Sequence, residues 1–218
     1  MRCLILGGMT ERFHEFWING PAIRQAVTAK GGEGFLTEDL SVLTSPELGN
    51  YDVIVNYTTG RNLTDDEAEG LLRFVRGGHG LVGLHCGADT FRSHPAYRAL
   101  LGGSFVHHPP QLDIEVEYVR EHPILNGVAP FTVHDELYLL DWDPDRVQVL
   151  AVTHSYEGGE IPVLWVREEG QGRVVYCSLG HNLATLHHTA IETVIAQAVE
   201  WAGEQARVSE SAQARGRG

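Results

Sequence analysis

Histidines stand shortly after several apolar runs of this chain, which is where a folded sheet would present them to a ligand. The chain has 218 residues, and 12 of them are histidine. His14, His85 and His181 each follow an apolar run that reads as a buried strand. In an open α/β sheet, ligands bind outside the carboxyl ends of the strands. An imidazole there can act as a base, an acid or a metal ligand. These positions predict a polar site, and the alternative is that the three side chains only bind loop backbone.

The segment Gly83–Gly87 reads G-L-H-C-G and has the pattern of a sharp turn between a strand and a helix. Such an elbow needs small residues two positions before and two positions after its central residue, because the turn packs tightly. Centring it on His85 puts glycine at both places, whereas centring it on Cys86 puts leucine and alanine there. We therefore expect His85 to point into the site and Cys86 to be a small buried residue. The alternative is that Cys86 is a nucleophile.

Two further clusters could contribute to the same site. His107 and His108 follow a glycine pair, and adjacent residues on an extended segment point in opposite directions, so only one of them should face the site. Asp135 and Glu136 stand beside Tyr138. Their carboxylates could orient a histidine, bind ligand hydroxyl groups or accept a proton. The alternative for this cluster is a solvated turn.

These observations together predict convergence. We expect His85, His108 and His181 to line one pocket, with Glu136 close by and His14 at its edge. A separation of more than roughly 12 Å between His85 and His181 would rule this out, because one small ligand could not bridge them in an ordinary pocket. The imidazoles of His85, His108 and His181 could also bind a divalent metal such as zinc. No local spacing such as H-x-x-x-H supports the metal.

The first half of the chain alternates between strands and helices, which predicts a parallel sheet covered on both faces. The predicted strands are Arg2–Leu6, Gly34–Glu38, Asp52–Tyr57 and Gly80–Leu84, and the predicted helices are Pro21–Lys30, Thr64–Arg76 and Pro95–Leu101.

Consecutive strands in the second half predict an antiparallel excursion after about residue 110. They are Leu112–Val119, Val147–Val152, Pro162–Arg167 and Arg173–Ser178, followed by a last helix at Ala190–Ala202. We therefore expect a three-layer α/β fold with a mainly parallel central sheet. Residues 1–203 should form one domain, and residues 204–218 should form a disordered tail because Val208 is their only large apolar residue.

Composition narrows the functional classes. The formal net charge of −13 argues against a nucleic-acid partner, which requires a basic surface. No apolar run is long enough to span a bilayer, and the first residues lack the pattern of a signal peptide. Three scattered cysteines are too few for a disulfide framework or a cysteine zinc site, so we expect a cytoplasmic protein. The oligomeric state stays open, a homo-oligomer included.

Several segments resemble the trehalose-utilisation, or ThuA-like, family. They are GLHCGADTF at Gly83–Phe91, LLGGSFVHHP at Leu100–Pro109, HP at His122-Pro123, DELY at Asp135–Tyr138, PVLWVREEGQGRVVY at Pro162–Tyr176 and SLGH at Ser178–His181. They run in the family's order and span most of residues 2–202. The resemblance implies a flavodoxin-like, class I glutamine amidotransferase-like fold without the usual Cys–His–Glu triad. It also implies a role in carbohydrate utilisation, with a small carbohydrate-like ligand.

The resemblance places its recurrent polar positions on His85, His108, Glu136 and His181, which we expect to be catalytic. As substrate-binding residues we expect His14, Tyr57, Asp135, Tyr138 and Asn182. The favoured function is an enzyme that acts on a sugar or keto-sugar derivative by histidine and carboxylate acid–base chemistry, with or without a metal. The alternatives are a thiol hydrolase or amidotransferase-like enzyme that uses Cys86, and a non-catalytic sugar-binding or regulatory domain.

Overall fold

The computed structural model describes residues 1–8, 13–155 and 159–215, the last nine of these as backbone only. The strands are β1 (Arg2–Leu6), β2 (Glu33–Thr37), β3 (Val53–Asn56), β4 (Gly80–Leu84), β5 (Gly103–His107), β6 (Leu112–Tyr118), β7 (Phe131–Asp135), β8 (Leu139–Trp142), β9 (Gln148–His154), β10 (Glu160–Glu169) and β11 (Gly172–Cys177). The α-helices are α1 (Phe16–Thr28), α2 (Asp65–Arg76), α3 (Pro95–Leu101), α4 (Leu183–Leu186) and α5 (Thr189–Arg215). Short 3-10 helices are η1 (Leu40–Thr44), η2 (Pro46–Asn50), η3 (His85–Ala88) and η4 (Pro123–Leu125).

A nine-stranded sheet runs through the molecule in the order β2-β1-β3-β4-β11-β10-β9-β6-β7. The pairs from β2 to β11 are parallel, and the pairs from β11 to β7 are antiparallel. β5 and β8 form a separate antiparallel ribbon. The predicted parallel sheet with an antiparallel excursion in the second half is confirmed. The antiparallel part, with four strands beyond the five parallel ones, is larger than expected.

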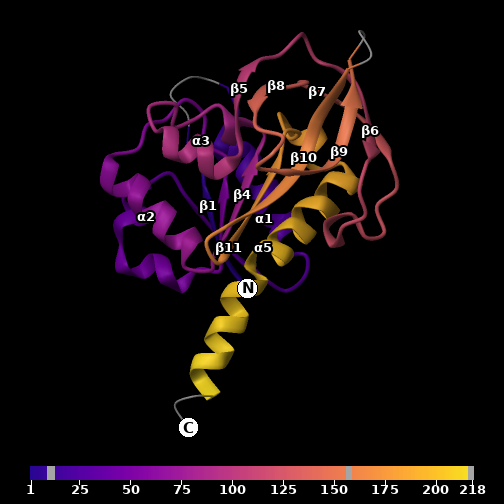
Figure 1. Ribbon diagram of the computed structural model, residues 1–218. Helices are drawn as coiled ribbons and strands as arrows, with labels where there is room; N and C mark the ends of the chain where they lie inside the picture. Colours follow the sequence, from indigo (N-terminus) through magenta and orange to yellow (C-terminus); the bar gives the residue numbers. More distant parts are fainter. Residues whose placement is uncertain (9–12, 156–158, 216–218) are drawn as a thin grey trace.

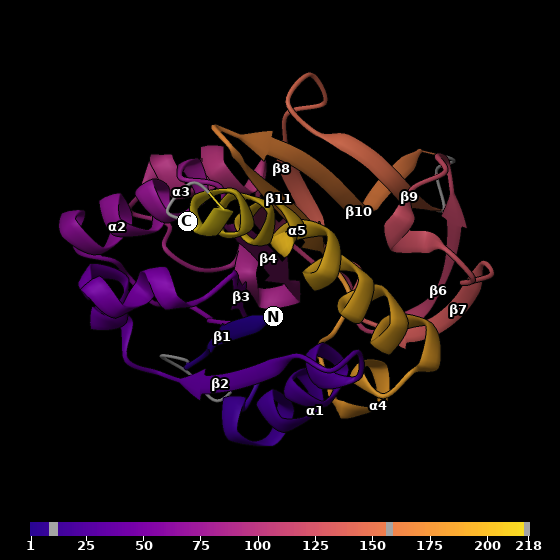
Figure 2. The same ribbon diagram turned by 90° about the horizontal axis from the view of Figure 1, so that it is seen from below.

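Helices cover both faces of the parallel part, which gives three layers (Figures 1 and 2). Successive residues of a strand point to opposite faces. Cys3 and Ile5 of β1 accordingly pack into the core under α1 and α5, whereas Leu4 and Leu6 pack into the core under α2 and α3. Strands buried on both faces must be apolar throughout, which is why the parallel strands were recognisable in the sequence.

Three short strands, β5, β7 and β8, were not predicted, because they have only five, five and four residues and are partly exposed. Helix α1 begins at Phe16, five residues before the predicted start at Pro21. In the sequence, Gly20 indicated a boundary before the helix, but it lies inside α1. A Cβ atom there would stand 3.0 Å from a side-chain carbon of Leu36, so the glycine allows α1 to approach β2.

The last helix is longer than predicted. Helix α5 continues to Arg215 and projects beyond the rest of the molecule in Figure 1, where we expected a disordered tail from residue 204. No glycine or proline interrupts residues 204–215, and their alanine, glutamate, glutamine and arginine residues favour a helix. The helix continues through Gly203. The glycine allows α5 to pack closely here, since a Cβ would lie 2.7 Å from Val53. No helix within the described residues is both long and apolar enough to cross a bilayer.

Candidate functional site

Three histidines that follow three parallel strands meet at the carboxyl edge of the sheet. His14 follows β1, His85 follows β4 and His181 follows β11. The ring centroid of His14 lies 4.8 Å from that of His85 and 4.9 Å from that of His181. The ring centroids of His85 and His181 are 5.4 Å apart. The predicted convergence of His85 and His181 is therefore confirmed, well inside the 12 Å limit.

His85 occupies the elbow that the glycine pattern predicted. Its backbone φ is +39°, in the left-handed region that side chains other than glycine rarely adopt. A Cβ on Gly87 would lie 2.8 Å from the carbonyl oxygen of Asn56, so the turn leaves no room for a larger residue. Nδ1 of His85 donates to the carbonyl oxygen of Ser178 at 2.7 Å. This bond fixes the tautomer and leaves Nε2, with its lone pair, directed toward the other histidines.

Cys86 is fully buried beside the elbow, as predicted. Burial raises the pKa of its thiol. A nucleophilic cysteine needs the opposite, a lowered pKa and access to the substrate. The structure gives Cys86 a packing role.

His14 reaches the centre of the site, although we expected it only at the edge. It also has a left-handed backbone, with φ +59°. Its Nδ1 lies 2.9 Å from Oγ1 of Thr59. Its Nε2 lies 3.1 Å from Nε2 of His85 and 3.0 Å from Nδ1 of His181. Burial and the neighbouring imidazoles of His85 and His181 lower the pKa of His14 to about 3, which makes its ring neutral at physiological pH.

The loop that carries His181 is held by buried polar groups behind the cluster. The carboxylate of Asp135 accepts hydrogen bonds from the backbone N–H groups of Gly180 at 2.7 Å and His181 at 3.2 Å. The hydroxyl of Tyr57 donates to the carbonyl oxygen of Gly180 at 2.8 Å. Both side chains are fully buried. They position the His181 loop and are not among the residues that line the pocket described below, and their predicted role in substrate binding stays a prediction.

Glu136 directly follows β7 and places one oxygen near all three histidines. Its Oε2 lies 3.0 Å from Nδ1 of His181, 3.4 Å from Nε2 of His85 and 4.0 Å from Nε2 of His14. Burial alone would raise the pKa of the Glu136 carboxyl, but hydrogen bonds and charge interactions with His181 and His85 outweigh it and lower that pKa. Glu136 is therefore an ionised carboxylate in a largely buried place.

The geometry defines a ligand set that differs from the predicted one. One ligand atom each from His14, His85, Glu136 and His181 lies within 4.8 Å of the others, which we call the four-residue cluster. The prediction named His108 in place of His14. His108 instead stands at the rim, with Nε2 3.6 Å from Oε2 of Glu136 and its Nδ1 donating to the carbonyl oxygen of Pro109.

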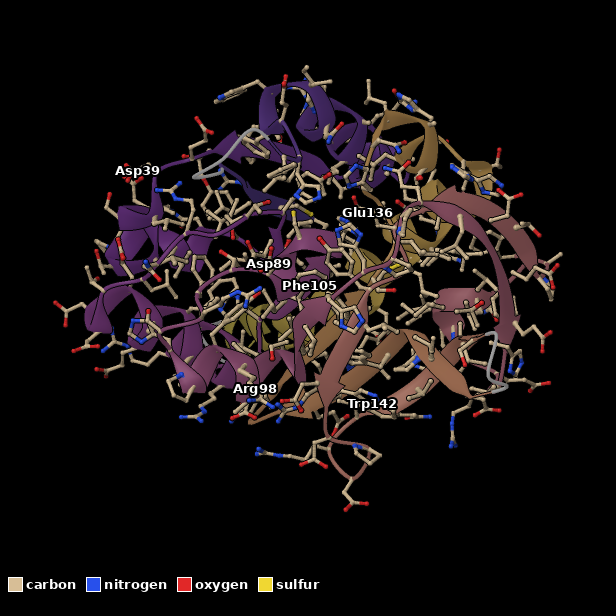
Figure 3. All side chains as sticks on the ribbon, turned by 90° about the horizontal axis from the view of Figure 1, so that it is seen from above. Asp39, Asp89, Arg98, Phe105, Glu136 and Trp142 are labelled. Carbon is tan, nitrogen blue, oxygen red and sulfur yellow. The ribbon has the colours of Figure 1, made fainter. Side chains whose placement is uncertain are left out.

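Three members of the cluster, His14, Glu136 and His181, line a pocket of about 360 Å³. His85, which we expected in the lining, is fully buried and is not among the lining residues. His108 lines the pocket, and its neighbour His107 lines a different pocket, which resolves the choice between them. Tyr138 also lines the first pocket, as predicted, and its ring packs 4.0 Å from that of His85. Figure 3 looks down on this edge and shows Asp89 and Phe105 beside Glu136.

Asp89 and Phe105 line the pocket and were missed. Asp89 lies directly after the elbow helix η3, at the same sheet edge as His85, and that position could have identified it. Asn182 was predicted to bind substrate, but its side chain caps α4 by accepting from the N–H of Thr185 at 3.1 Å. It is not among the residues that line the pocket.

Five further histidines, which we expected to have no chemical role, contact groups outside the cluster. The side chains of His79 and His94 contact backbone carbonyl groups, and those of His134 and His154 lie beside exposed carboxylates. His122 accepts a hydrogen bond from the backbone at the start of η4. None of these five belongs to the four-residue cluster within the described chain.

Comparison with known proteins gives both a family and a fold. The family model described as ThuA, trehalose utilisation, matches residues 2–202. A protein from Parabacteroides merdae described as ThuA-like superposes with a TM-score of 0.80 at 17% identity, covering 93% of this chain and 89% of that one. A ThuA-like protein from Bacteroides uniformis gives 0.75 at 23% identity, covering 92% and 90%.

A more distant likeness is to a protein from Salmonella typhimurium that is described as cytoplasmic. It has a TM-score of 0.64 and 13% identity, and the match covers 93% of this chain and 99% of that one. At these identities the three structures show the fold alone. No curated protein sequence matches the chain.

Proposed function

Because the chain belongs to the ThuA family, which is described by trehalose utilisation, we propose that it is an enzyme that acts on a sugar or keto-sugar derivative with a divalent metal ion held by the four-residue cluster. The observation that carries the proposal is the approach of three imidazole nitrogens and one carboxylate oxygen to a common centre. Zinc is the metal that this mixture of nitrogen and oxygen donors suits best.

The spacing of the donor atoms fits a metal. Ligands about 2.0–2.1 Å from a tetrahedral zinc stand roughly 3.3 Å from one another. The separations of His14 from His85 and His181, and of Glu136 from His181 and His85, range from 3.0 to 3.4 Å. The 4.0 Å between Nε2 of His14 and Oε2 of Glu136 is wider, and all four donor atoms lie within 4.8 Å of one another.

The hydrogen-bond partners of the candidate metal-binding histidines also fit a metal site. Metal-binding histidines commonly use their second ring nitrogen for a hydrogen bond that fixes the ring. His85 has such a bond to Ser178, and His14 lies beside the hydroxyl of Thr59. The low pKa of His14 keeps its ring neutral, which is the form that binds a metal.

A bound divalent ion would polarise a carbonyl or hydroxyl oxygen of the substrate. His108 is the residue of this chain that is placed to move a proton next to that oxygen. It lines the pocket, it is partly exposed, and the bond from its Nδ1 to Pro109 leaves Nε2 directed toward Glu136. The aromatic ring of Tyr138 forms a wall on which a sugar ring can pack.

The test is a screen for turnover of sugars and 3-keto-sugars, with protein stripped of metal by a chelator and with the same protein reloaded with zinc. Turnover that needs the metal and is lost in His108→Ala supports the proposal. Turnover that survives complete metal removal contradicts the metal assignment. Binding of sugars without turnover of any of them would identify a non-catalytic sugar-binding domain instead.

The finer features of the fold and location belong to the same proposal. The parallel strands run in the order β2-β1-β3-β4-β11, which matches the 2-1-3-4-5 order of flavodoxin-like sheets. This supports a class I glutamine amidotransferase-like ancestry in which His85 stands at the elbow. Cys86 and Cys177 are buried and take part in no disulfide, which supports a reducing, cytoplasmic location.

A further inference from the structure

A second and larger pocket lies beside the first. Its volume is about 620 Å³, within the usual range for small-molecule sites. It lies at the ends of β6, β9 and β10, on the antiparallel part of the sheet. Its floor is aliphatic and consists of Leu112, Leu137, Leu139 and Ile161. A floor of this kind favours a ligand with an apolar surface over one that is polar on all sides.

The two pockets are separated by single segments of backbone, whose alternate side chains line one pocket or the other. Glu136 and Tyr138 line the first pocket, whereas Leu137 and Leu139 line the second. Likewise, His108 lines the first pocket and His107 lines the second. Side chains alternate between the two faces of an extended segment, and consecutive Cα atoms are about 3.8 Å apart. A ligand bound in the first pocket therefore needs to cross only this rim to reach the second.

The charges of the lining of the second pocket disfavour an anionic group there. Asp89 and Glu136 line the first pocket, and Asp113 and Glu115 line the second. No lysine or arginine is found among the described residues that line either pocket. A phosphate group in the second pocket would face two carboxylates and, apart from the imidazoles of His107 and His154, no basic side chain, which is unfavourable.

These observations lead to one inference, which rests on the proposed function. We infer that the substrate is a glycoside, with its sugar in the first pocket and an apolar, uncharged aglycone across the rim in the second. The shared backbone segments place the two parts of one molecule next to each other, and the aliphatic floor and acidic rim select an aglycone that is apolar and carries no phosphate.

The experiment measures the affinity of methyl, butyl and hexyl glucopyranosides by isothermal titration calorimetry. Each methylene that enters the second pocket should tighten binding by up to about fourfold, the factor that corresponds to burial of one CH₂ group. Leu139→Asp and Ile161→Asp should remove this increase and leave the affinity for methyl glucoside unchanged. Val106→Asp is the control, because Val106 is 55% exposed and lines neither pocket.

The outcomes separate this inference from the proposed function. If methyl glucoside binds but longer chains bind no better, the aglycone inference is wrong and the proposed function stands. If no glucoside binds, 1-hexanol tests the second pocket alone. Shifts of the methyl NMR signals of Leu139 and Ile161 then support the pocket, and unchanged signals overturn it. Hexyl phosphate that binds as tightly as hexanol would overturn the exclusion of anions.

Discussion

Nε2 of His14 lies 3.1 Å from Nε2 of His85, although 71 positions separate the two residues in the chain. The hydrogen bond from His85 to Ser178 places the proton of that ring on Nδ1, so its Nε2 presents a lone pair to His14. Two ring nitrogens this close are stable only when a proton or a cation stands between them. The buried carboxylate of Glu136 supplies the negative charge that a cation requires.

Removal of one ligand should weaken metal binding strongly. His181→Ala and His14→Ala each take one of four donors from the cluster. We expect the zinc affinity, measured by competition with a chromophoric chelator, to fall on the order of 100-fold or more, beyond the 10–100-fold typical of residues behind the ligands. His134→Ala is the matched control, because its exposed ring pairs only with Asp113. Equal zinc affinities in the three variants would contradict the ligand assignment.

Asp135→Asn should disturb the His181 loop, although the new side chain has nearly the same size as the old one. The carboxylate now accepts bonds from the N–H groups of residues 136, 180 and 181, and an amide would turn a donor toward some of them. We expect a loss of about 1–3 kcal/mol in the free energy of unfolding, measured with denaturant. We also expect a metal affinity that is lower by roughly 10–100-fold. A variant that unfolds earlier but binds zinc normally would show that Asp135 stabilises the fold and does not position His181.

Cys86→Ala should retain the turnover of whichever sugar the screen identifies, within a few-fold, because the thiol is buried and does not line the pocket. The native thiols should also resist labelling by Ellman's reagent until the protein is unfolded. A loss of a hundredfold or more, on the order of that expected for a nucleophile, in a folded variant would establish the thiol mechanism instead. Glu136→Gln provides the comparison, since it alters the cluster itself.

Gly87→Ala tests the elbow. The new Cβ would lie 2.8 Å from the carbonyl oxygen of Asn56, and a backbone atom in a central strand cannot move cheaply. Overpacking of this kind costs about 1–3 kcal/mol. Gly49→Ala is the control, because a Cβ there has no neighbour within 4 Å. Similar denaturation midpoints for the two variants would mean that the elbow is not tightly packed.

The sequence predicted the sheet edge better than it predicted the roles of individual side chains. His85 and His181 were found because each follows an apolar strand, and the carboxyl ends of parallel strands meet at one edge. His14 stands eight positions beyond the last residue of β1, and no periodicity constrains a side chain at that distance.

Polar residues behind the site were harder to interpret. Tyr57 and Asp135 have the residue types of a ligand-binding site, but their partners are backbone groups of the His181 loop. Such partners are distant in the chain, so only the three-dimensional structure distinguishes a residue that binds a ligand from one that holds a loop. The alternation of side chains along an extended segment likewise predicted that His107 and His108 diverge, but not which of them faces Glu136.

The most direct test of the metal site is X-ray absorption at the zinc edge, on protein purified without added chelator and reloaded to one zinc per chain. We predict a first shell of nitrogen and oxygen atoms at about 2.0–2.1 Å, with outer-shell scattering from three imidazoles and no sulfur. In His14→Ala the imidazole scattering should fall to that of two rings. A protein that takes up no zinc at micromolar concentrations, or a spectrum that contains zinc–sulfur bonds, would contradict the account.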